Sequence, residues 1–178
     1  RSGRRTKNPP DLSVGSVNRE HYLKQIRPFY ESDLIKIITG IRRCGKSVIL
    51  KQVLNELEAA GKKCLFLDFD QRPVRANIPD ADALISYVNA YLSKEKLYVF
   101  LDEVQNVEGW NEAARTLRLY NASLFITGSN SKLLSREFTK ELSGRYVSFR
   151  IRPFVYREAK EYADQLGRRF ELIDYLVW

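Results

Sequence analysis

Residues 40–47 read Gly-Ile-Arg-Arg-Cys-Gly-Lys-Ser, a complete G-x-x-x-x-G-K-S pattern that constrains the fold more than any other feature of the chain. An apolar run over 34–39 precedes the pattern, and a helical pattern follows from Lys46. A phosphate-binding loop needs both neighbours. A strand must deliver the chain to a tight turn whose backbone N–H groups face the phosphate, and a helix N-terminus must add its partial positive charge. The context therefore predicts a phosphate-binding loop.

Residue type predicts the roles within this loop. Lys46 is expected to reach the β- and γ-phosphates of a nucleotide, and the hydroxyl of Ser47 is expected to bind Mg²⁺. Arg42 and Arg43, in the variable part of the loop, could touch phosphate, but we expect their side chains to point outward. The residues predicted to surround the phosphates are Gly40, Ile41, Arg42, Arg43, Cys44, Gly45, Lys46, Ser47 and Val48.

Strand and helix patterns alternate along the rest of the chain. Strands are predicted over 34–39, 63–69, 97–101, 123–127 and 146–151. Helices are predicted over 18–30, 46–60, 82–93, 110–120, 131–142 and 154–165. Such alternation is typical of an α/β fold in which a mainly parallel sheet carries helices on both faces. Residues 1–17, rich in Arg, Gly, Ser and Pro, are expected to form a flexible basic lead-in.

Bulk properties narrow the function classes. No apolar run approaches the ~20 residues that a membrane-spanning helix needs. The two cysteines and one histidine argue against a structural zinc site, and two unpaired thiols favour the cytoplasm. The net charge is +8, and Arg1, Arg4, Arg5 and Lys7 supply half of it. A role in nucleic-acid binding is therefore left open. Since the chain contains no Met, we expect it to be a piece of a longer protein.

Two adjacent acids end the apolar run Tyr98-Val99-Phe100-Leu101, and they form the second strong motif. Asp102 at the tip of a buried strand is expected to bind Mg²⁺ together with Ser47, and Glu103 is expected to orient and polarise the attacking water. A GTPase of the Ras type would have Asp-x-x-Gly here and Asn-Lys-x-Asp later, and neither occurs. A small-molecule kinase does not need Glu103. The pair therefore favours ATP hydrolysis.

Two weaker sites complete the predicted catalytic set. Ser129 or Asn130, just after the predicted strand 123–127, is suited to hold the attacking water beside the γ-phosphate, although Asn130 is equally suited to cap the next helix. Arg145 could neutralise charge on the γ-phosphoryl oxygens, either in its own chain or on a neighbour's nucleotide. The alternative for Arg145 is an ordinary surface residue.

Taken together, the chain resembles the AAA+-like P-loop ATPases of bacteria and archaea that carry an uncharacterised C-terminal domain. The matching phrases are residues 38–47, 100–106, 126–131, 142–146 and 152–158. The resemblance implies a three-layer P-loop NTPase fold with a five-stranded sheet in the order 5-1-4-3-2, and ATP and Mg²⁺ as ligands. It carries over Lys46, Ser47, Asp102 and Glu103, and less firmly Ser129, Asn130 and Arg145. It also implies an ATPase domain over 18–165 and the start of a lid or C-terminal region over 166–178.

The sequence thus predicts Mg-dependent ATP hydrolysis that couples nucleotide state to conformational change. Two alternatives stay open: a nucleotide-binding switch with negligible turnover, and an ATPase that contacts nucleic acid through its basic surface. A homo-oligomer is expected if Arg145 acts on a neighbouring molecule. A protein partner is expected to bind through the C-terminal domain that relatives carry beyond this sequence, and no membrane contact is expected.

Overall fold

The computed structural model describes residues 19–129 and 142–153, together with the single positions 133, 140, 160, 163, 164, 167, 169 and 171. The chain divides into two compact units, one formed by Arg19–Pro153 and the other by residues 1–18 with 154–178. The sheet and the candidate site both belong to Arg19–Pro153. The predicted lead-in over 1–17, Asn130, and most of the helices predicted over 131–142 and 154–165 lie outside the described residues.

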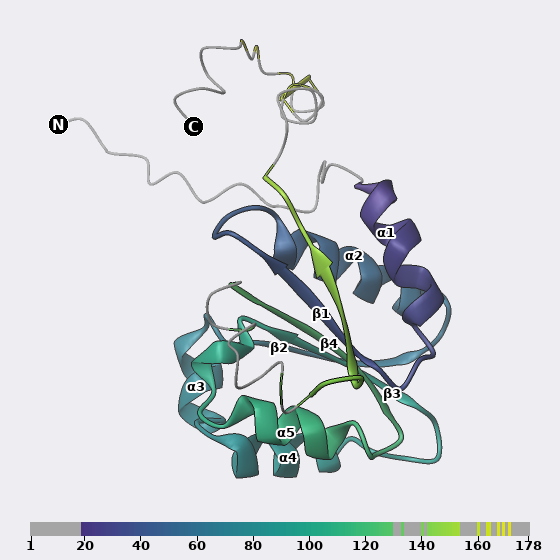
Figure 1. The fold of residues 1–178 in the computed structure, drawn as a ribbon, viewed down its shortest axis with the longest axis vertical. Helices are drawn as coiled ribbons and strands as arrows, with labels where there is room; N and C mark the ends of the chain where they lie inside the picture. Colours follow the sequence, from purple (N-terminus) through teal and green to yellow (C-terminus); the bar gives the residue numbers. More distant parts are fainter. Residues whose placement is uncertain are drawn as a thin grey trace, which may run out of the picture. The chain divides into compact units, whose positions relative to one another are not determined.

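Five parallel strands form one sheet in the order β2-β3-β4-β1-β5 (Figure 1). The strands are β1 (Ile35–Gly40), β2 (Lys63–Asp68), β3 (Leu97–Asp102), β4 (Ala122–Ser129) and β5 (Tyr146–Arg150). Every residue of β1 and β3 is buried, as the continuous apolar runs predict for central strands, whereas β2 and β5 lie at the edges and are partly exposed. The predicted order, with β4 between β1 and β3, is confirmed.

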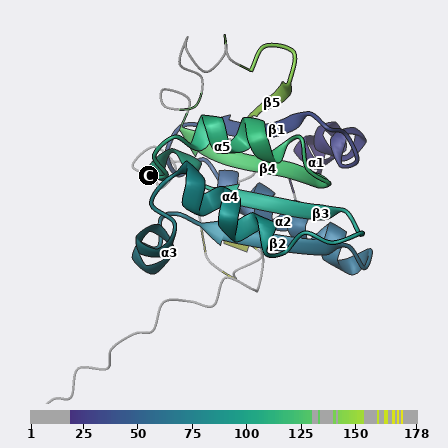
Figure 2. The same cartoon turned by 90° about the horizontal axis from the view of Figure 1, so that it is seen from below.

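Helices cover both faces of this sheet. The helical elements are α1 (Glu20–Ile26), η1 (Arg27–Phe29), α2 (Lys46–Ala59), α3 (Arg72–Asn77), α4 (Ala81–Asn89), η2 (Val104–Asn106) and α5 (Trp110–Leu117). Helices α1 and α2 lie on one face, and α4 and α5 lie side by side on the other (Figures 1 and 2). This arrangement confirms the predicted three-layer α/β architecture.

The prediction of the connection after β2 was incomplete, because it treated this polar stretch as free of helix. The structure places α3 there, with Pro73 in the first turn. Proline is well tolerated at that position, since the first N–H groups of a helix have no partner within the helix. Downstream, Asp80 caps α4, and its side chain accepts a hydrogen bond from the N–H of Ala83 at 2.9 Å.

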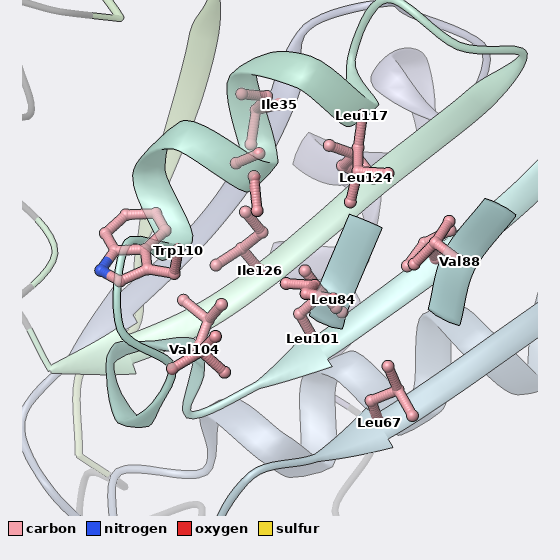
Figure 3. Close-up of a cluster of buried hydrophobic side chains, with 14 of the residues drawn as sticks. Ile35, Leu67, Leu84, Val88, Leu101, Val104, Trp110, Leu117, Leu124 and Ile126 are labelled. Atoms are coloured by element: carbon pink, nitrogen blue, oxygen red, sulfur yellow. The ribbon is translucent and has the colours of Figure 1, made fainter. Parts of the chain in front are cut away.

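Two separate apolar clusters hold the layers together. The first fills the space between the sheet and helices α4 and α5, and Figure 3 shows Leu84, Val88 and Leu117 of the helices directed at the strands. The second lies under α1 and α2, where the rings of Phe100 and Phe125 stack with centroids 4.8 Å apart. A sheet that is apolar on both faces can place polar groups only at the ends of its strands.

The carboxyl ends of the parallel strands meet at one edge of the sheet, called here the C-terminal edge. Gly40 of β1 pairs with Ser129 of β4, and Asp68 of β2 pairs with Asp102 of β3. The predicted phosphate loop and the predicted acid pair therefore follow neighbouring parts of the same edge. In open α/β sheets this is the edge at which ligands bind.

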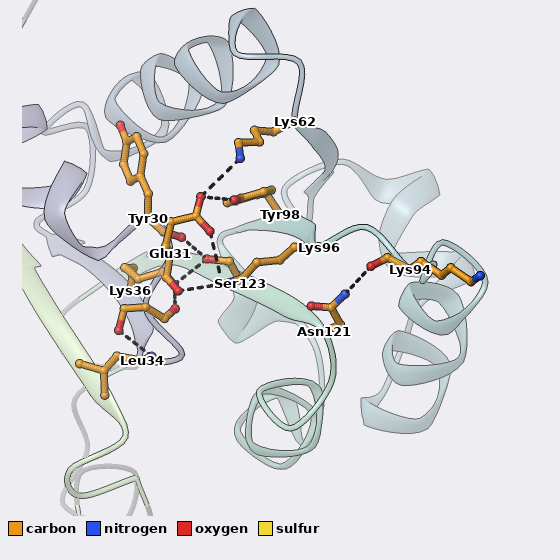
Figure 4. Close-up of polar contacts among 11 residues, drawn as sticks. Tyr30, Glu31, Leu34, Lys36, Lys62, Lys94, Lys96, Tyr98, Asn121 and Ser123 are labelled. Atoms are coloured by element: carbon orange, nitrogen blue, oxygen red, sulfur yellow. Dashed lines mark hydrogen bonds and ion pairs between the residues drawn. The ribbon is translucent and has the colours of Figure 1, made fainter.

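The opposite end of the strands, called here the N-terminal edge, carries a polar cluster of its own (Figure 4). Lys36 of β1 is completely buried, and its Nζ donates to the carbonyl of Ser32 at 3.0 Å and to Ser123 Oγ at 2.7 Å. Nearby, the phenol of Tyr98 donates to the carboxylate of Glu31. This cluster fastens the segment after η1 to the start of the sheet.

Candidate nucleotide-binding site

The loop between β1 and α2 turns through backbone conformations that favour glycine. Gly45 has φ 92°, and Arg43 adopts φ 61°, which is unusual for a residue with a side chain. A Cβ at Gly40 would lie 2.4 Å from Cys44 Sγ and 2.6 Å from the carbonyl oxygen of Ile151, so only glycine fits there without a shift. The loop is therefore a compact turn packed against the chain that follows β5.

Side chains in this loop divide into exposed and buried sets. Ile41, Arg42 and Arg43 are exposed, so the two arginines point outward, as expected. Cys44 is only 1% exposed, and burial raises the pKa of its thiol. The thiol is therefore held neutral inside the loop, which makes it less prone to oxidation than an exposed cysteine.

Lys46 begins α2, and its side chain is buried within the loop. Its Nζ lies 3.1 Å from the carbonyl oxygen of Ile41 and 3.6 Å from Glu103 Oε1. Because Gly45 is the N-cap of α2, no side chain caps the first turn of the helix. The first N–H groups of α2 and the ammonium of Lys46 thus face the same end of the helix, an arrangement suited to an anion.

Asp102 and Ser47 lie within hydrogen-bonding distance of each other. Ser47 Oγ donates to Asp102 Oδ1 at 3.1 Å, and Thr127 Oγ1 of β4 donates to the same carboxylate oxygen. Burial raises the pKa of the Asp102 carboxyl, and the two hydroxyl donors oppose that effect. A nearby cation would favour the ionised form.

This set of oxygen donors fits Mg²⁺, which prefers hard oxygen ligands and is usually held by one or two carboxylates together with substrate phosphates and water. Over the described residues, no group of three or more His, Cys, Asp or Glu side chains is placed to hold a metal ion. A magnesium site formed with a nucleotide needs no such group. The assignment of Ser47 and Asp102 as metal ligands stays a prediction that the donor chemistry supports.

Glu103 lies at the same edge with its backbone in the left-handed region, at φ 52°. Its N–H donates to Thr127 Oγ1 at 3.0 Å, and its carboxylate accepts a hydrogen bond from Gln105 Nε2. The Lys46 ammonium lies on the other carboxylate oxygen. Both carboxylate oxygens of Glu103, the predicted water-activating residue, therefore have a partner: Gln105 on one and Lys46 on the other.

Gln105 is itself tightly packed. Its Oε1 is buried and makes no hydrogen bond to the described part of the chain. A Cβ at Gly128 would lie 2.4 Å from that oxygen and 2.6 Å from the side chain of Leu133, so glycine at 128 leaves the room that the Gln105 amide occupies. Gln105 and Thr127 are the site residues that sequence reasoning missed. The only signal for Thr127 was a polar residue at the end of an apolar strand.

The remaining predicted catalytic residues, Ser129, Asn130 and Arg145, do not all lie at the C-terminal edge. Ser129 is half-buried at the end of β4, opposite Gly40, whereas Asn130 lies outside the described residues. Arg145 is exposed, and its backbone carbonyl accepts a hydrogen bond from the N–H of Ile35 at 3.0 Å. Ile35 is the first residue of β1, so Arg145 lies at the N-terminal edge.

The position of Arg145 corrects one of the two roles left open for it. The length of β1, roughly 16 Å, separates Arg145 from the loop that follows Gly40. An arginine side chain at the N-terminal edge therefore does not reach a phosphate bound in the loop of its own chain. A role on a neighbouring molecule's nucleotide stays a prediction.

Comparisons of the sequence identify relatives of this chain. A protein-family model described as an AAA domain matches residues 32–160. An uncharacterized protein of Haemophilus influenzae is 37% identical over 171 residues, which cover 93% of this chain and 42% of that protein. An uncharacterized protein of Methanocaldococcus jannaschii is 29% identical over 160 residues, covering 89% of this chain and 34% of that protein. The chain thus spans less than half the length of each of these relatives.

Solved structures share the fold at low sequence identity. Saccharomyces cerevisiae Hsp104, in its complex with casein, has a TM-score of 0.62 and 15% identity, covering 87% of this chain and 30% of that one. AMPPCP-bound DnaA from Aquifex aeolicus has a TM-score of 0.55 and 19% identity, covering 92% of this chain and 56% of that one. The family and the fold are those of nucleotide-binding ATPases. No helix in the described ranges is both long and apolar enough to span a bilayer.

Proposed function

Since the chain belongs to the AAA-domain family, we propose that it binds Mg-ATP in the loop of residues 40–47 and hydrolyses the γ-phosphate bond. One observation carries the proposal. Two segments that are distant in sequence, the start of α2 and the end of β3, bring Lys46, Ser47 and the Asp102–Glu103 pair together at the C-terminal edge, with Ser47 3.1 Å from Asp102 and Lys46 3.6 Å from Glu103. This arrangement supports a site in which a phosphate loop, a metal ligand and a base for water would lie at one edge of the sheet.

Binding would use the groups at the start of α2. The backbone N–H groups of the loop and the Lys46 ammonium would hold the β- and γ-phosphates, and Ser47 with Asp102 would hold Mg²⁺. A bound Mg²⁺ would neutralise charge on the phosphate oxygens. The ammonium of Lys46 would then exchange part of its contact with Glu103 for contact with phosphate, which frees one carboxylate oxygen of Glu103.

Hydrolysis would use that freed carboxylate. Glu103 would accept a proton from a water molecule whose oxygen attacks the γ-phosphorus, and the bond from that phosphorus to the bridging oxygen of ADP would break. The products are ADP and inorganic phosphate. Because Thr127 bonds both the Glu103 N–H and the Asp102 carboxylate, it would keep the base and the metal ligand in one geometry. Ser129, or Asn130 beyond it, would hold the attacking water.

A nucleotide-binding switch is the second candidate, and the contacts of Glu103 favour it. Both carboxylate oxygens are engaged, one by Lys46 and one by Gln105. If bound ATP left the Gln105 contact intact, Glu103 would stay turned from water and turnover would be negligible. The nucleic-acid alternative rests on the net charge alone, half of which lies in residues 1–8.

The location of Arg145 at the N-terminal edge supports a further proposal about assembly. An arginine that does not reach its own loop can still act on the nucleotide of an adjacent molecule, so we expect hydrolysis to rise with protein concentration if Arg145 completes a neighbour's site. The share of each relative's length beyond this chain leaves room for a domain that binds a protein partner.

The deciding experiment measures Mg-ATP binding and phosphate release by the chain beside its Glu103→Gln variant. We expect the variant to bind ATP as the parent does. Its rate of phosphate release should fall by roughly 100-fold or more, since the amide cannot accept the proton. Glu112→Gln, at an exposed position in the first turn of α5, is the matched control and should leave both unchanged.

Three results separate the candidates. Equal turnover in Glu103→Gln would assign the base to another residue. Binding without phosphate release in the parent chain would favour the switch. Retention of full turnover after magnesium is removed with EDTA would contradict the predicted role of Ser47 and Asp102 as metal ligands.

A further inference from the structure

A buried arginine that the proposed mechanism does not use joins the phosphate loop to the chain after β5. Arg19, the first residue of the unit Arg19–Pro153, is only 2% exposed. Its Nη1 donates to the carbonyl of Cys44 at 3.0 Å, and its Nη2 donates to the carbonyl of Arg152 at 2.8 Å. Its guanidinium carbon also lies 4.6 Å from the centre of the Tyr22 ring. One guanidinium thus bridges two segments that are more than a hundred residues apart in sequence.

The contact with Cys44 bears directly on the anion-binding groups of the loop. The carbonyl of Cys44 and the N–H of Gly45 belong to one planar trans peptide, so they point in opposite directions. A donor that holds the carbonyl on one side of the loop therefore orients the Gly45 N–H toward the other side. Gly45 adopts φ 92°. Because glycine populates many backbone conformations, its own preferences do little to fix the direction of this peptide. Phosphate loops bind through such N–H groups, so their direction matters for affinity.

The contact with Arg152 fixes the other segment just as firmly. The N–H of Arg152 donates to the hydroxyl of Tyr22 at 3.0 Å, while its carbonyl is held by Arg19. One residue earlier, the N–H of Ile151 donates to the carbonyl of Thr39 at 2.7 Å. The backbone of 151–152 is therefore pinned to the last residues of β1 and to α1, directly before the unit ends at Pro153.

An arginine suits this double contact, and a lysine does not. The planar guanidinium presents parallel donors in a fixed fork and stays charged when buried, whereas an ammonium is a single point donor that loses its charge more readily on burial. Because the Arg19 side chain is buried and already bonded to two carbonyls, it is not available for contact with a nucleotide base.

We propose that Arg19 is a positioning residue for nucleotide binding, which orients the Cys44–Gly45 peptide toward the phosphates and couples occupancy of the loop to the Arg152 peptide. The proposal rests on the proposed nucleotide-binding function. In this proposal Arg19, the first residue of the unit, transmits the nucleotide state of the loop to Arg152, which lies just before the last residue of the unit. A change in the loop peptide would thereby be passed to the segment after β5 through a single side chain.

The first test compares the affinities of Arg19→Gln and Arg19→Lys for ATP and ADP, measured by titration calorimetry. We expect Arg19→Gln to lose about tenfold or more in affinity for both, since a charge-assisted hydrogen bond to the loop is removed, and Arg19→Lys to lose less. The matched control is Arg27→Gln. Arg27 forms a similar fork to Glu20 and Glu56 on the neighbouring helices, and within the described part of the chain its hydrogen bonds do not involve the loop. That variant should melt at a lower temperature with affinity within about twofold of the parent.

The second test uses a readout that a purely structural role would not move. Amide hydrogen exchange is measured at Gly45, Arg152 and the β3 strand, with and without saturating ATP. In the parent, ATP should slow Gly45 and Arg152 together. In Arg19→Gln, ATP should still slow Gly45 but no longer slow Arg152, while β3 keeps its protection. Tyr22→Phe, which removes only the bond to the Arg152 N–H, should speed exchange at Arg152 with nearly unchanged affinity.

Unchanged ATP affinity in Arg19→Gln would overturn the positioning role, and slowing of Arg152 by ATP in that variant would overturn the coupling. A loss of affinity that comes with a loss of β3 protection would show a global effect and would also overturn the proposal. Absence of ATP binding by the parent chain would instead refute the proposed function. The bridge itself is then tested without nucleotide, because Arg19→Gln should speed exchange at Arg152 in the ligand-free protein, and unchanged exchange would overturn it.

Discussion

The two edges of the sheet each bury a lysine, but only one of these lysines lies beside a carboxylate. At the C-terminal edge, the Lys46 ammonium lies 3.6 Å from a carboxylate, that of Glu103. At the N-terminal edge, Lys36 is bonded to a carbonyl and a hydroxyl and lies 4.8 Å from the centre of the Phe125 ring. Burial lowers the pKa of Lys36 to about 7. Burial of a charged residue type therefore does not by itself identify a site; its partners do.

The backbone separates the two edges in the same way. Arg43 and Glu103 are the residues other than glycine that have positive φ in the described ranges, and both lie at the C-terminal edge. Such conformations cost of order 1 kcal/mol or more and persist where the surrounding structure enforces them, often at functional sites. The N-terminal edge, by contrast, satisfies its polar groups with ordinary strand and turn geometry. The comparison teaches that the edge with the strained backbone is the one that holds the proposed nucleotide site.

The strongest way to break this comparison is to remove each lysine in turn. Lys46→Ala should weaken ATP binding by roughly 100-fold or more, because it removes a side-chain cation expected to contact the β- and γ-phosphates. Lys36→Met, which keeps a long side chain and removes the amine, should bind ATP as the parent does. Calorimetric titration of both variants checks this, and equal affinity in Lys46→Ala would place the nucleotide elsewhere.

The pH dependence of stability sharpens the contrast. Because the pKa of Lys36 falls from 10.5 to about 7 on folding, the unfolded chain binds a proton between these values that the folded protein does not. The free energy of unfolding should therefore rise with pH from about 7 to 10, with a contribution of at most about 1.4 kcal/mol per pH unit. Above pH 10 stability should fall, since burial raises the pKa values of Tyr98 and Tyr30 in the folded state.

Urea unfolding across pH 7–10 measures this slope in the parent and in Lys36→Met. The variant should lose most of the rise with pH, although Glu31, Asp33 and Lys96 around the site remain. An identical slope in the variant would show that Lys36 keeps its proton in the folded protein. That result would make the two edges alike in charge and would remove the distinction drawn between them.

The smallest expected effect concerns the exposed part of the N-terminal edge. Lys62 lies 3.7 Å from Glu31, whose side chain is 63% exposed. Lys62→Ala should change the free energy of unfolding by less than about 1 kcal/mol, because solvent screens exposed ion pairs. Urea denaturation checks it. A larger loss would mean that this pair supports the hydrogen bond from Tyr98 to Glu31.

Much of the fold was predictable because the sequence reports burial directly. The strand over 97–101 and the helix after Lys46 are long apolar patterns with a single reading, and the structure places β3 and α2 there. The strand order came from the resemblance, since periodicity does not say which strands are neighbours. Helix α3 was not among the predicted helices, although Pro73 is well suited to the first turn of a helix.

The site was predictable only where a motif names its residues. Lys46, Ser47, Asp102 and Glu103 come from two motifs, and the structure brings them together at one edge. Thr127 is found only when β4 is placed beside β3. Nothing in the sequence shows that the guanidinium of Arg19 is buried against the backbone of a distant loop. Contacts of this kind depend on tertiary packing, and local patterns do not record them.

Because the Cys44 thiol is buried in the phosphate loop, its rate of chemical modification reports how often the loop opens. A thiol that is shielded and protonated reacts with an alkylating reagent only during the moments when the loop opens, so the rate of its modification equals the frequency of opening times the chance of capture. Cys64, on the edge strand β2 and only half-buried, serves as an internal reference in the same reaction. Ligands that close the loop would slow the alkylation of Cys44 and leave the alkylation of Cys64 unchanged. The ratio of the two rates would therefore measure how often the loop opens.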